Sequence, residues 1–252
     1  MVAAIHGDEP CGVRAIERLL DDPPAVERPV KFVVANERAL DRTVRYVDED
    51  LNRAFPGDPD ADTHEGRLAA EVADEIRDCT VLSLHSTQSY ADPFALVDRV
   101  GDLARSICPF LPVSVLVETG EESGGRLIEY PDVLEVECGL QGSDRAADNG
   151  VELIRGFLRA TDVLAEDAPT TPESATDEVV VYRLGPPVPK TVADEYEVFA
   201  TNFEEVAAGE TFAAADDRPV VADESFYPVL LSAYGYENVF GYRADRVGVL
   251  DG

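Results

Sequence analysis

The sequence has no tryptophan, one methionine and only two lysines, at positions 31 and 190. Arginine supplies the rest of the 21 basic residues, and 51 acidic residues bring the formal net charge to −30. This balance argues against a nucleic-acid partner, because a phosphate backbone is bound through Lys and Arg. The acidic residues are spread along the whole chain, so we expect a halophilic protein whose self-repulsion is screened by high salt. An acidic face for a cationic partner is the alternative.

Long hydrophobic runs and paired cysteines are also missing. No apolar run approaches the ~18 residues of a membrane-spanning helix, and the start of the chain lacks the basic region of a signal peptide. We therefore expect a cytoplasmic protein without a membrane partner. The four cysteines are far apart and form no C-x-x-C pair, which argues against a zinc knuckle and a disulfide framework. Buried reduced thiols are expected.

The first 164 residues alternate between strand and helix patterns. Short apolar segments predict strands at residues 2–5, 30–35, 80–84, 113–117 and 133–138. Amphipathic patterns predict helices at residues 10–21, 64–77 and 143–161. This alternation predicts an α/β fold with a mixed, mostly parallel sheet flanked by helices.

The pattern changes after residue 164. Residues 165–178 are polar, contain proline and lack periodicity, which is typical of a linker. Short β-type runs then follow at residues 179–184, 196–201, 220–222 and 229–231, without a convincing helix. We therefore predict a main domain at 1–164, a linker at 165–178 and a small β-rich C-terminal domain at 179–252.

Two polar clusters stand at predicted strand ends. His6 and Glu9 lie where the first strand gives way to a helix, and His85 directly follows the strand at 80–84. In parallel α/β sheets, sites form at the carboxyl ends of strands. Two histidines and one glutamate are a known catalytic zinc set, which leaves one position for water. The spacing alone leaves a second interpretation open, in which the histidines are structural hydrogen-bonding groups.

Residues 45–57 form a long connection without helical or strand periodicity. Such a segment is either a solvated loop or a binding loop. Arg53 could clamp a carboxylate through two parallel hydrogen bonds, and Asn52 could add a donor.

The strand at 133–138 carries two carboxylates, Glu135 and Glu137, on one face, because strand side chains alternate with period two. Buried carboxylates are costly unless they are paired or face a cleft. Glu137 is nearer the strand end and is the better candidate for a general base. The alternative is that both glutamates lie on the solvent-exposed face of an edge strand.

Four motifs, taken in order, resemble the aspartoacylase/succinylglutamate desuccinylase family of the zinc carboxypeptidase clan. His6-Gly-Asp-Glu9 is similar to its H-G-x-E motif, and residues 50–57 match D-L-N-R-x-F-P-G. His85 is similar to its strand-end zinc histidine, and residues 137–141 match E-x-G-x-Q. Asn36 lies where the family has its N-P-x-A segment, but the sequence departs from the family at the next residue, where Glu37 replaces the proline. It also begins only five residues before His6, so either the start is late or one sheet edge is reduced.

The resemblance implies a role for each matched residue. His6, Glu9 and His85 would bind one zinc ion, which would activate a water molecule and polarise the scissile amide carbonyl. Glu137 would act as the general base and return the proton to the leaving amine. Arg45 would stabilise the oxyanion.

The same resemblance implies the substrate contacts. Asn52 and Arg53 would hold the carboxylate of an N-acyl amino acid. Arg126 lies one residue away from the place of a second carboxylate-binding arginine, so a surface arginine is the alternative. Tyr234 and Tyr236 compete for the family's closing tyrosine, with plain packing as the alternative.

We therefore expect zinc-dependent hydrolysis of the amide bond of an N-acyl amino acid. The alternatives are a non-catalytic, metal-bound binding protein for small molecules and a carboxypeptidase acting on short peptides. The position of Glu137 relative to the metal ligands separates the first alternative from an enzyme. The sequence leaves a homodimer open.

Overall fold

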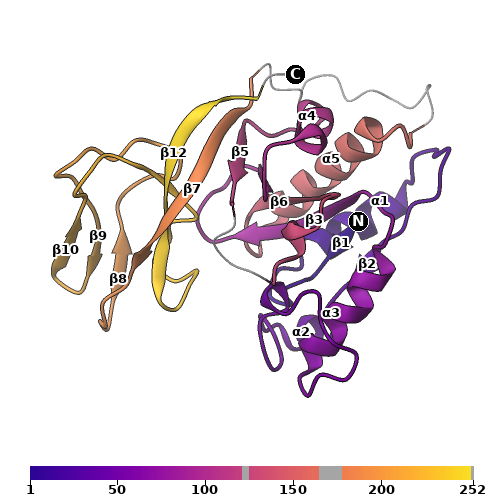
Figure 1. Cartoon of the computed structure of the whole chain (residues 1–252), viewed down its shortest axis with the longest axis horizontal. Helices are drawn as coiled ribbons and strands as arrows, with labels where there is room; N and C mark the ends of the chain where they lie inside the picture. The colour runs from indigo at the N-terminus through magenta and orange to yellow at the C-terminus, as the bar shows by residue number, and fades with distance from the viewer. Residues whose placement is uncertain (121–124, 165–177, 251–252) are drawn as a thin grey trace.

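The protein is described as a computed structural model that covers residues 1–120, 125–164 and 178–250 (Figure 1). Its centre is a nine-stranded sheet in the order β11-β12-β7-β5-β4-β6-β3-β1-β2. The strands are β1 Val2–Ala3, β2 Val33–Val34, β3 Val81–Thr87, β4 Phe94–Val97, β5 Val115–Glu118, β6 Val133–Leu140, β7 Val180–Pro189, β11 Tyr227–Val229 and β12 Val239–Val249. Strand β4 is antiparallel to β6, and β12 is antiparallel to both of its neighbours; the other pairs are parallel.

Helices cover both faces of this sheet. The longer ones are α1 Cys11–Asp21, α3 His64–Glu75 and α5 Asp144–Ala160, and the short ones are α2 Glu37–Arg42 and α4 Asp102–Ile107. Three single turns of 3-10 helix follow the same order: η1 Leu51–Arg53, η2 Cys108–Phe110 and η3 Leu127–Glu129. Side-chain caps fix two of the helix starts, because Thr63 accepts a hydrogen bond from Gly66 N and Ser143 accepts one from Ala146 N.

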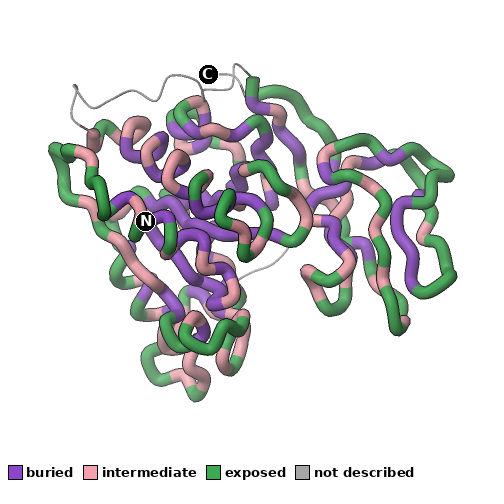
Figure 2. The backbone as a smooth tube through the Cα atoms, turned by 180° about the vertical axis from the view of Figure 1, so that it is seen from behind, coloured by how far each residue is buried: buried purple, intermediate pink, exposed green. Residues whose placement is uncertain are grey.

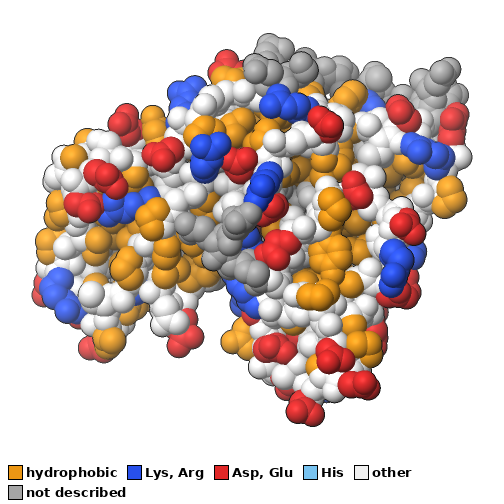
Figure 3. All heavy atoms as spheres, viewed as in Figure 1, with side chains coloured by type: hydrophobic (Ala, Val, Ile, Leu, Met, Phe, Trp, Pro, Cys, Tyr) orange, Lys and Arg blue, Asp and Glu red, His pale blue; other side chains and the backbone are white. Residues whose placement is uncertain are grey.

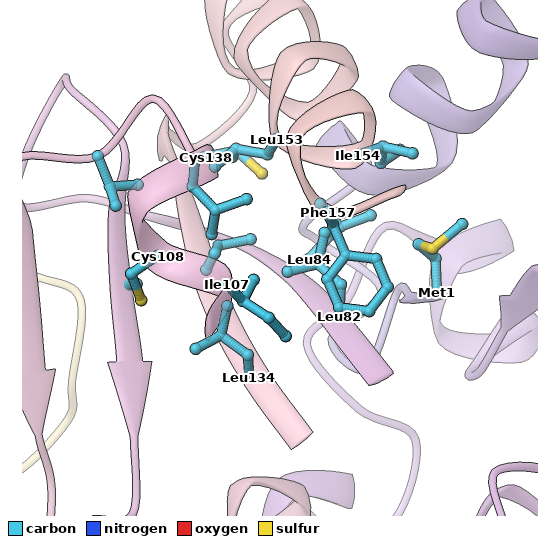
Figure 4. Close-up of a cluster of buried hydrophobic side chains, with 14 of the residues drawn as sticks. Met1, Leu82, Leu84, Ile107, Cys108, Leu134, Cys138, Leu153, Ile154 and Phe157 are labelled. Atoms are coloured by element: carbon cyan, nitrogen blue, oxygen red, sulfur yellow. The ribbon is translucent and has the colours of Figure 1, made fainter. Parts of the chain in front are cut away.

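Two apolar clusters show which helices belong to which face. Helices α1, α4 and α5 pack on one face, where Leu82 and Leu84 of β3 meet Phe157 of α5 (Figure 4). Helix α3 packs on the other face through Ala69 and Val72. The buried part of the backbone therefore runs through the centre of the molecule (Figure 2). Because strand side chains alternate, His85 points away from the face to which Leu84 contributes.

The C-terminal part adds strands to the main sheet and builds a second sheet. Strand β7 pairs with β5 in parallel, and β12 and β11 extend the sheet beyond it. The second sheet consists of β8 Tyr196–Val198, β9 Thr211–Ala215 and β10 Arg218–Val221, all antiparallel. The predicted fold class is confirmed: a mostly parallel mixed sheet is flanked by helices and joined by a small antiparallel sheet.

The main sheet spans the domain boundary that the sequence suggested. Residues 165–177 of the predicted linker lie outside the described residues, and the division into domains stays a prediction. Within the described residues, no helix combines the length and apolar character needed to cross a membrane. Carboxylates are scattered over the face seen in Figure 3, with arginines between them.

Candidate active site

The sheet order brings the predicted metal ligands together. Strand β3 lies between β1 and β6. His6 and Glu9 follow β1, and His85 of β3 stands opposite Glu137 of β6 in the strand register. These ends border a cavity of about 530 Å³. All ten predicted site residues line it: His6, Glu9, Arg45, Asn52, Arg53, His85, Arg126, Glu137, Tyr234 and Tyr236.

Glu9 contacts both histidines of the cluster. Its Oε1 lies 2.8 Å from His6 Nδ1, and its Oε2 lies 3.2 Å from His85 Nδ1. The backbone N–H of Ser86 donates a hydrogen bond to Oε2 at 3.1 Å. All three ligand residues are buried, and one ligand atom from each lies within 4.8 Å of the others. Among the described residues, no other group of His, Cys, Asp and Glu side chains forms such a cluster.

The close approach of these groups perturbs their protonation. Burial by itself lowers the pKa of His85, but the nearby carboxylates of Glu135 and Glu9 raise this pKa to about 10. Burial raises the pKa of Glu9, yet the two imidazoles hold it well below its ordinary value. An anionic carboxylate between two imidazoles, all removed from solvent, is an arrangement that a divalent cation would stabilise.

Hydrogen bonds on the far side of each imidazole fix its orientation. His6 Nε2 lies 3.1 Å from Asp50 Oδ1, and His85 Nε2 lies 3.1 Å from Ser83 Oγ. Partners of this kind set the tautomer of a metal-binding histidine and increase its basicity. The donor set and its outer partners therefore fit Zn²⁺, which these three side chains would hold.

Glu137 lines the same cavity, and one of its carboxylate oxygens is unpaired among the described residues. Its Oε2 is buried and has no hydrogen-bond partner among the described residues. Burial, reinforced by the charge of Glu9, raises the pKa of Glu137 to about 8. The second carboxyl of the strand, Glu135, lies farther along the cavity wall, with Oε1 3.8 Å from His85 Nε2. The two glutamates of β6 thus line a cleft, and neither stands on the wet face of an edge strand.

Arg45 is bound to the metal-ligand cluster. Its Nε and Nη2 donate to Asp50 Oδ2 at 3.2 and 3.1 Å, and its Nη1 donates to Glu9 Oε1 at 3.4 Å. Asp50 therefore bridges Arg45 and His6. No role was predicted for Asp50 from the sequence, although it is the first residue of the D-L-N-R motif.

The predicted carboxylate-binding residues lie on one wall. Asn52 Oδ1 accepts a hydrogen bond from Leu127 N at 2.9 Å, and Arg53 Nη1 donates to Asn52 O at 2.6 Å. Arg126 Nη2 donates to Gly120 O at 3.0 Å, and only 11% of the Arg126 side chain is exposed. Arg126 is therefore part of the cavity wall and is not a surface arginine.

The two candidate tyrosines differ in depth. Tyr234 is 63% exposed, and its hydroxyl accepts a hydrogen bond from Tyr196 N at 3.3 Å. Tyr236 is half-buried; burial raises the pKa of its phenol, and the guanidinium groups of Arg45 and Arg53 oppose that rise. The geometry favours Tyr236 as the tyrosine that closes the cavity.

Comparisons with known proteins agree with this architecture. Residues 1–100 match the succinylglutamate desuccinylase/aspartoacylase catalytic domain. An N-acyl-aromatic-L-amino acid amidohydrolase (carboxylate-forming) of Xenopus laevis is 26% identical over 212 residues, which span 79% of this chain and 68% of that protein.

Two solved structures share the fold. Murine aminoacylase 3 matches with a TM-score of 0.72 and 21% identity, over 99% of this chain and 96% of that one. The ectoine utilization protein EutE (DoeB) from Ruegeria pomeroyi matches with a TM-score of 0.72 and 20% identity, over 100% and 84% of the two chains. Residues 1–100 therefore match the catalytic domain of the succinylglutamate desuccinylase/aspartoacylase family, and the whole chain shares the fold of these two solved structures.

Proposed function

We propose that this protein is a zinc-dependent amidohydrolase that cleaves N-acyl amino acids into a carboxylate and a free amino acid. One observation carries the proposal: the unpartnered, buried carboxyl oxygen of Glu137 faces the cavity that His6, Glu9 and His85 also line. The named activity of the Xenopus relative, an amidohydrolase of N-acyl-aromatic amino acids, supports the same reaction class.

His6, Glu9 and His85 would hold the zinc ion. When bound there, Zn²⁺ supplies Lewis-acid polarisation of the amide carbonyl and a lowered pKa for water. Ser83 and Asp50 keep both imidazoles turned toward Glu9 through their hydrogen bonds to the opposite ring nitrogens.

Glu137 is the proton carrier in this proposal. Its Oε2 accepts the proton of the attacking water as the bond to the carbonyl carbon forms. The same carboxyl then delivers the proton to the amide nitrogen as the C–N bond breaks. Burial that raises the pKa of a carboxyl makes it a stronger base, which suits both transfers.

Arg45 has N–H donors that could bind the oxyanion. A guanidinium carries five N–H groups, and the hydrogen bonds to Asp50 and Glu9 use three of them. The remaining two can stabilise the negative charge that develops on the carbonyl oxygen.

The rest of the cavity suggests where the substrate lies. Asn52, Arg53 and Arg126 offer polar groups for the carboxylate of the amino acid. Apolar side chains also form part of the cavity wall: Leu96, Ile128, Leu184, Leu230 and Val239. Such a wall would receive an aliphatic or aromatic side chain better than an acidic one, because burial of a second carboxylate there would leave it unpaired.

The test is release of free amine from a panel of substrates at high salt, with zinc added or chelated. The panel contains N-acetylphenylalanine, N-acetylleucine, N-acetylaspartate, N-succinylglutamate and an N-blocked dipeptide. We expect zinc-dependent release, fastest from the apolar N-acetyl amino acids. Release from the dipeptide alone would favour a carboxypeptidase. A folded, zinc-loaded protein that binds these compounds and releases nothing would favour the non-catalytic alternative.

A further inference from the structure

We propose that Glu65 is a positioning residue that holds the segment 45–50, and with it Arg45 and Asp50, against the metal-ligand cluster. The inference rests on the proposed function for its catalytic readout. Glu65 does not line the cavity. It acts on the site through the backbone of the segment.

The carboxylate of Glu65 is fully buried and accepts four hydrogen bonds. Its Oε1 accepts from Val47 N at 2.6 Å and from Asn36 Nδ2 at 3.0 Å. Its Oε2 accepts from Asp48 N at 3.0 Å and from Glu49 N at 3.3 Å. Three successive backbone N–H groups of the segment therefore converge on one side chain.

The segment needs such an anchor. Residues 45–50 belong to no helix or strand. Their backbone N–H groups therefore need acceptors other than those of regular secondary structure. Consecutive N–H groups that point inward form a nest for an anion. Glu65 stands in the first turn of α3, where the helix dipole also favours a negative charge. The hydrogen bonds outweigh the effect of burial and lower the pKa of Glu65, which keeps it anionic.

Both ends of the anchored segment enter the active site. Arg45 O accepts a hydrogen bond from Gly7 N at 3.1 Å, and Asp50 Oδ1 lies 3.1 Å from His6 Nε2. Arg45 and Asp50 are also bonded to each other. If the middle of the segment moves, Arg45 leaves Glu9 and Asp50 leaves His6.

Asn36 belongs to the same anchor. Its Nδ2 donates to Glu65, while its Oδ1 accepts from Ala39 N at 3.1 Å and so caps α2. Asn36 is the first residue of the segment that resembles N-P-x-A, in which Glu37 stands in place of the proline. Its side chain links α2, the segment 45–50 and α3 at one point.

The main test compares Glu65→Gln with Glu71→Gln. The amide of Gln is close in shape to the carboxylate, but its NH₂ cannot accept a hydrogen bond, so at least one backbone N–H is left unpaired. Glu71 is a matched control, because it lies on the same helix α3, is exposed and does not line the cavity. Both variants are checked for thermal unfolding before use. If Glu65→Gln does not fold, Glu65→Asp, which keeps the charge and shortens its reach, replaces it.

We expect Glu65→Gln to lower kcat by roughly tenfold or more with KM within about threefold, because an oxyanion donor acts in the transition state. Glu71→Gln should match the wild type. When Glu65→Gln is added to Arg45→Ala at saturating zinc, the further loss in kcat should stay below about twofold, since the effect through Asp50 on zinc binding is then removed and both changes act through Arg45. Full additivity of the two losses would overturn the inference.

Zinc affinity supplies a readout that does not need turnover. Release of Asp50 from His6 should weaken zinc binding by roughly tenfold in Glu65→Gln, and zinc binding by Glu71→Gln should be unchanged. If the wild type hydrolyses no substrate, the proposed function fails while this measurement still tests the role of Glu65. Unchanged zinc affinity in Glu65→Gln would contradict that role.

Discussion

Gly7, between the predicted ligands His6 and Glu9, is a position where a single methyl group should disturb the whole site. A Cβ on residue 7 would lie 2.1 Å from the backbone carbon of Ala39 and 2.3 Å from the nitrogen of Leu40. Non-bonded carbon atoms are comfortable at about 3.5–4.0 Å. Helix α2 would therefore have to retreat by more than about 1 Å. The retreat would pull on Arg45, whose carbonyl accepts the N–H of Gly7.

We expect Gly7→Ala to destabilise the protein by about 1–3 kcal/mol, the usual cost of overpacking a tightly packed site. Urea unfolding at fixed high salt measures this loss, and chelator competition measures zinc affinity on the same samples. Gly101→Ala is the control, because a Cβ there would meet nothing within 4 Å and its backbone is extended. The control should change stability by less than about 1 kcal/mol, because Gly101 is the N-cap of α4, where Ala is somewhat less favourable than Gly. If Gly7→Ala is as stable as Gly101→Ala and binds zinc normally, the packing argument is wrong.

Three further predictions concern metal affinity, pH and salt. Asp50→Asn should weaken zinc binding by about 10–100-fold, because Asp50 orients His6; chelator competition measures it, and an unchanged affinity would contradict the outer-partner role. Glu65 has a lowered pKa, so its contribution to stability is complete above the ordinary value of 4.5 and is lost as the pH falls through the lowered value. Urea unfolding from pH 6 downward should thus show a shallower acid-side decline in Glu65→Gln than in the wild type, and parallel curves would refute this. Finally, the unfolding temperature should rise with added NaCl, because salt screens the repulsion within a chain of net charge −30; a flat response would contradict adaptation to high salt.

Periodicity predicted the long helices well because each has one apolar face and one polar face. The expected ranges 10–21, 64–77 and 143–161 correspond to α1, α3 and α5 within two residues at each end. The short α2 and α4 were missed, since six residues are too few to show a period.

Strand β4 was missed because its four apolar residues are too few to show a period. Strands β9 and β12 were missed because their compositions disfavour a strand and tertiary pairing overrides that preference. Strand β9 is Ala-rich, and β12 contains two glycines and three charged residues. Strand β12 exists because it pairs along most of β7, which no local pattern can reveal. The expected strand at 30–35 shrinks to Val33–Val34 at the sheet edge, where one neighbour is lacking.

The candidate site was predictable where a motif fixes both residue type and strand end. His6, Glu9, His85 and Glu137 belong to such motifs, and their convergence follows from the strand order. Their chemical roles stay predictions. Contacts that depend on distant segments were out of reach, such as the Glu65 anchor and the choice between Tyr234 and Tyr236.

The most direct test of the account is turnover by the wild type and Glu137→Gln, at equal zinc content, on the best substrate of the panel. Glutamine keeps the shape of Glu137 but cannot carry the proton. We predict that Glu137→Gln binds zinc and substrate with affinities close to those of the wild type, while kcat falls by at least about 10²-fold. A Glu137→Gln variant that retains wild-type kcat would contradict the assignment of Glu137 as the general base and, with it, the proposed mechanism.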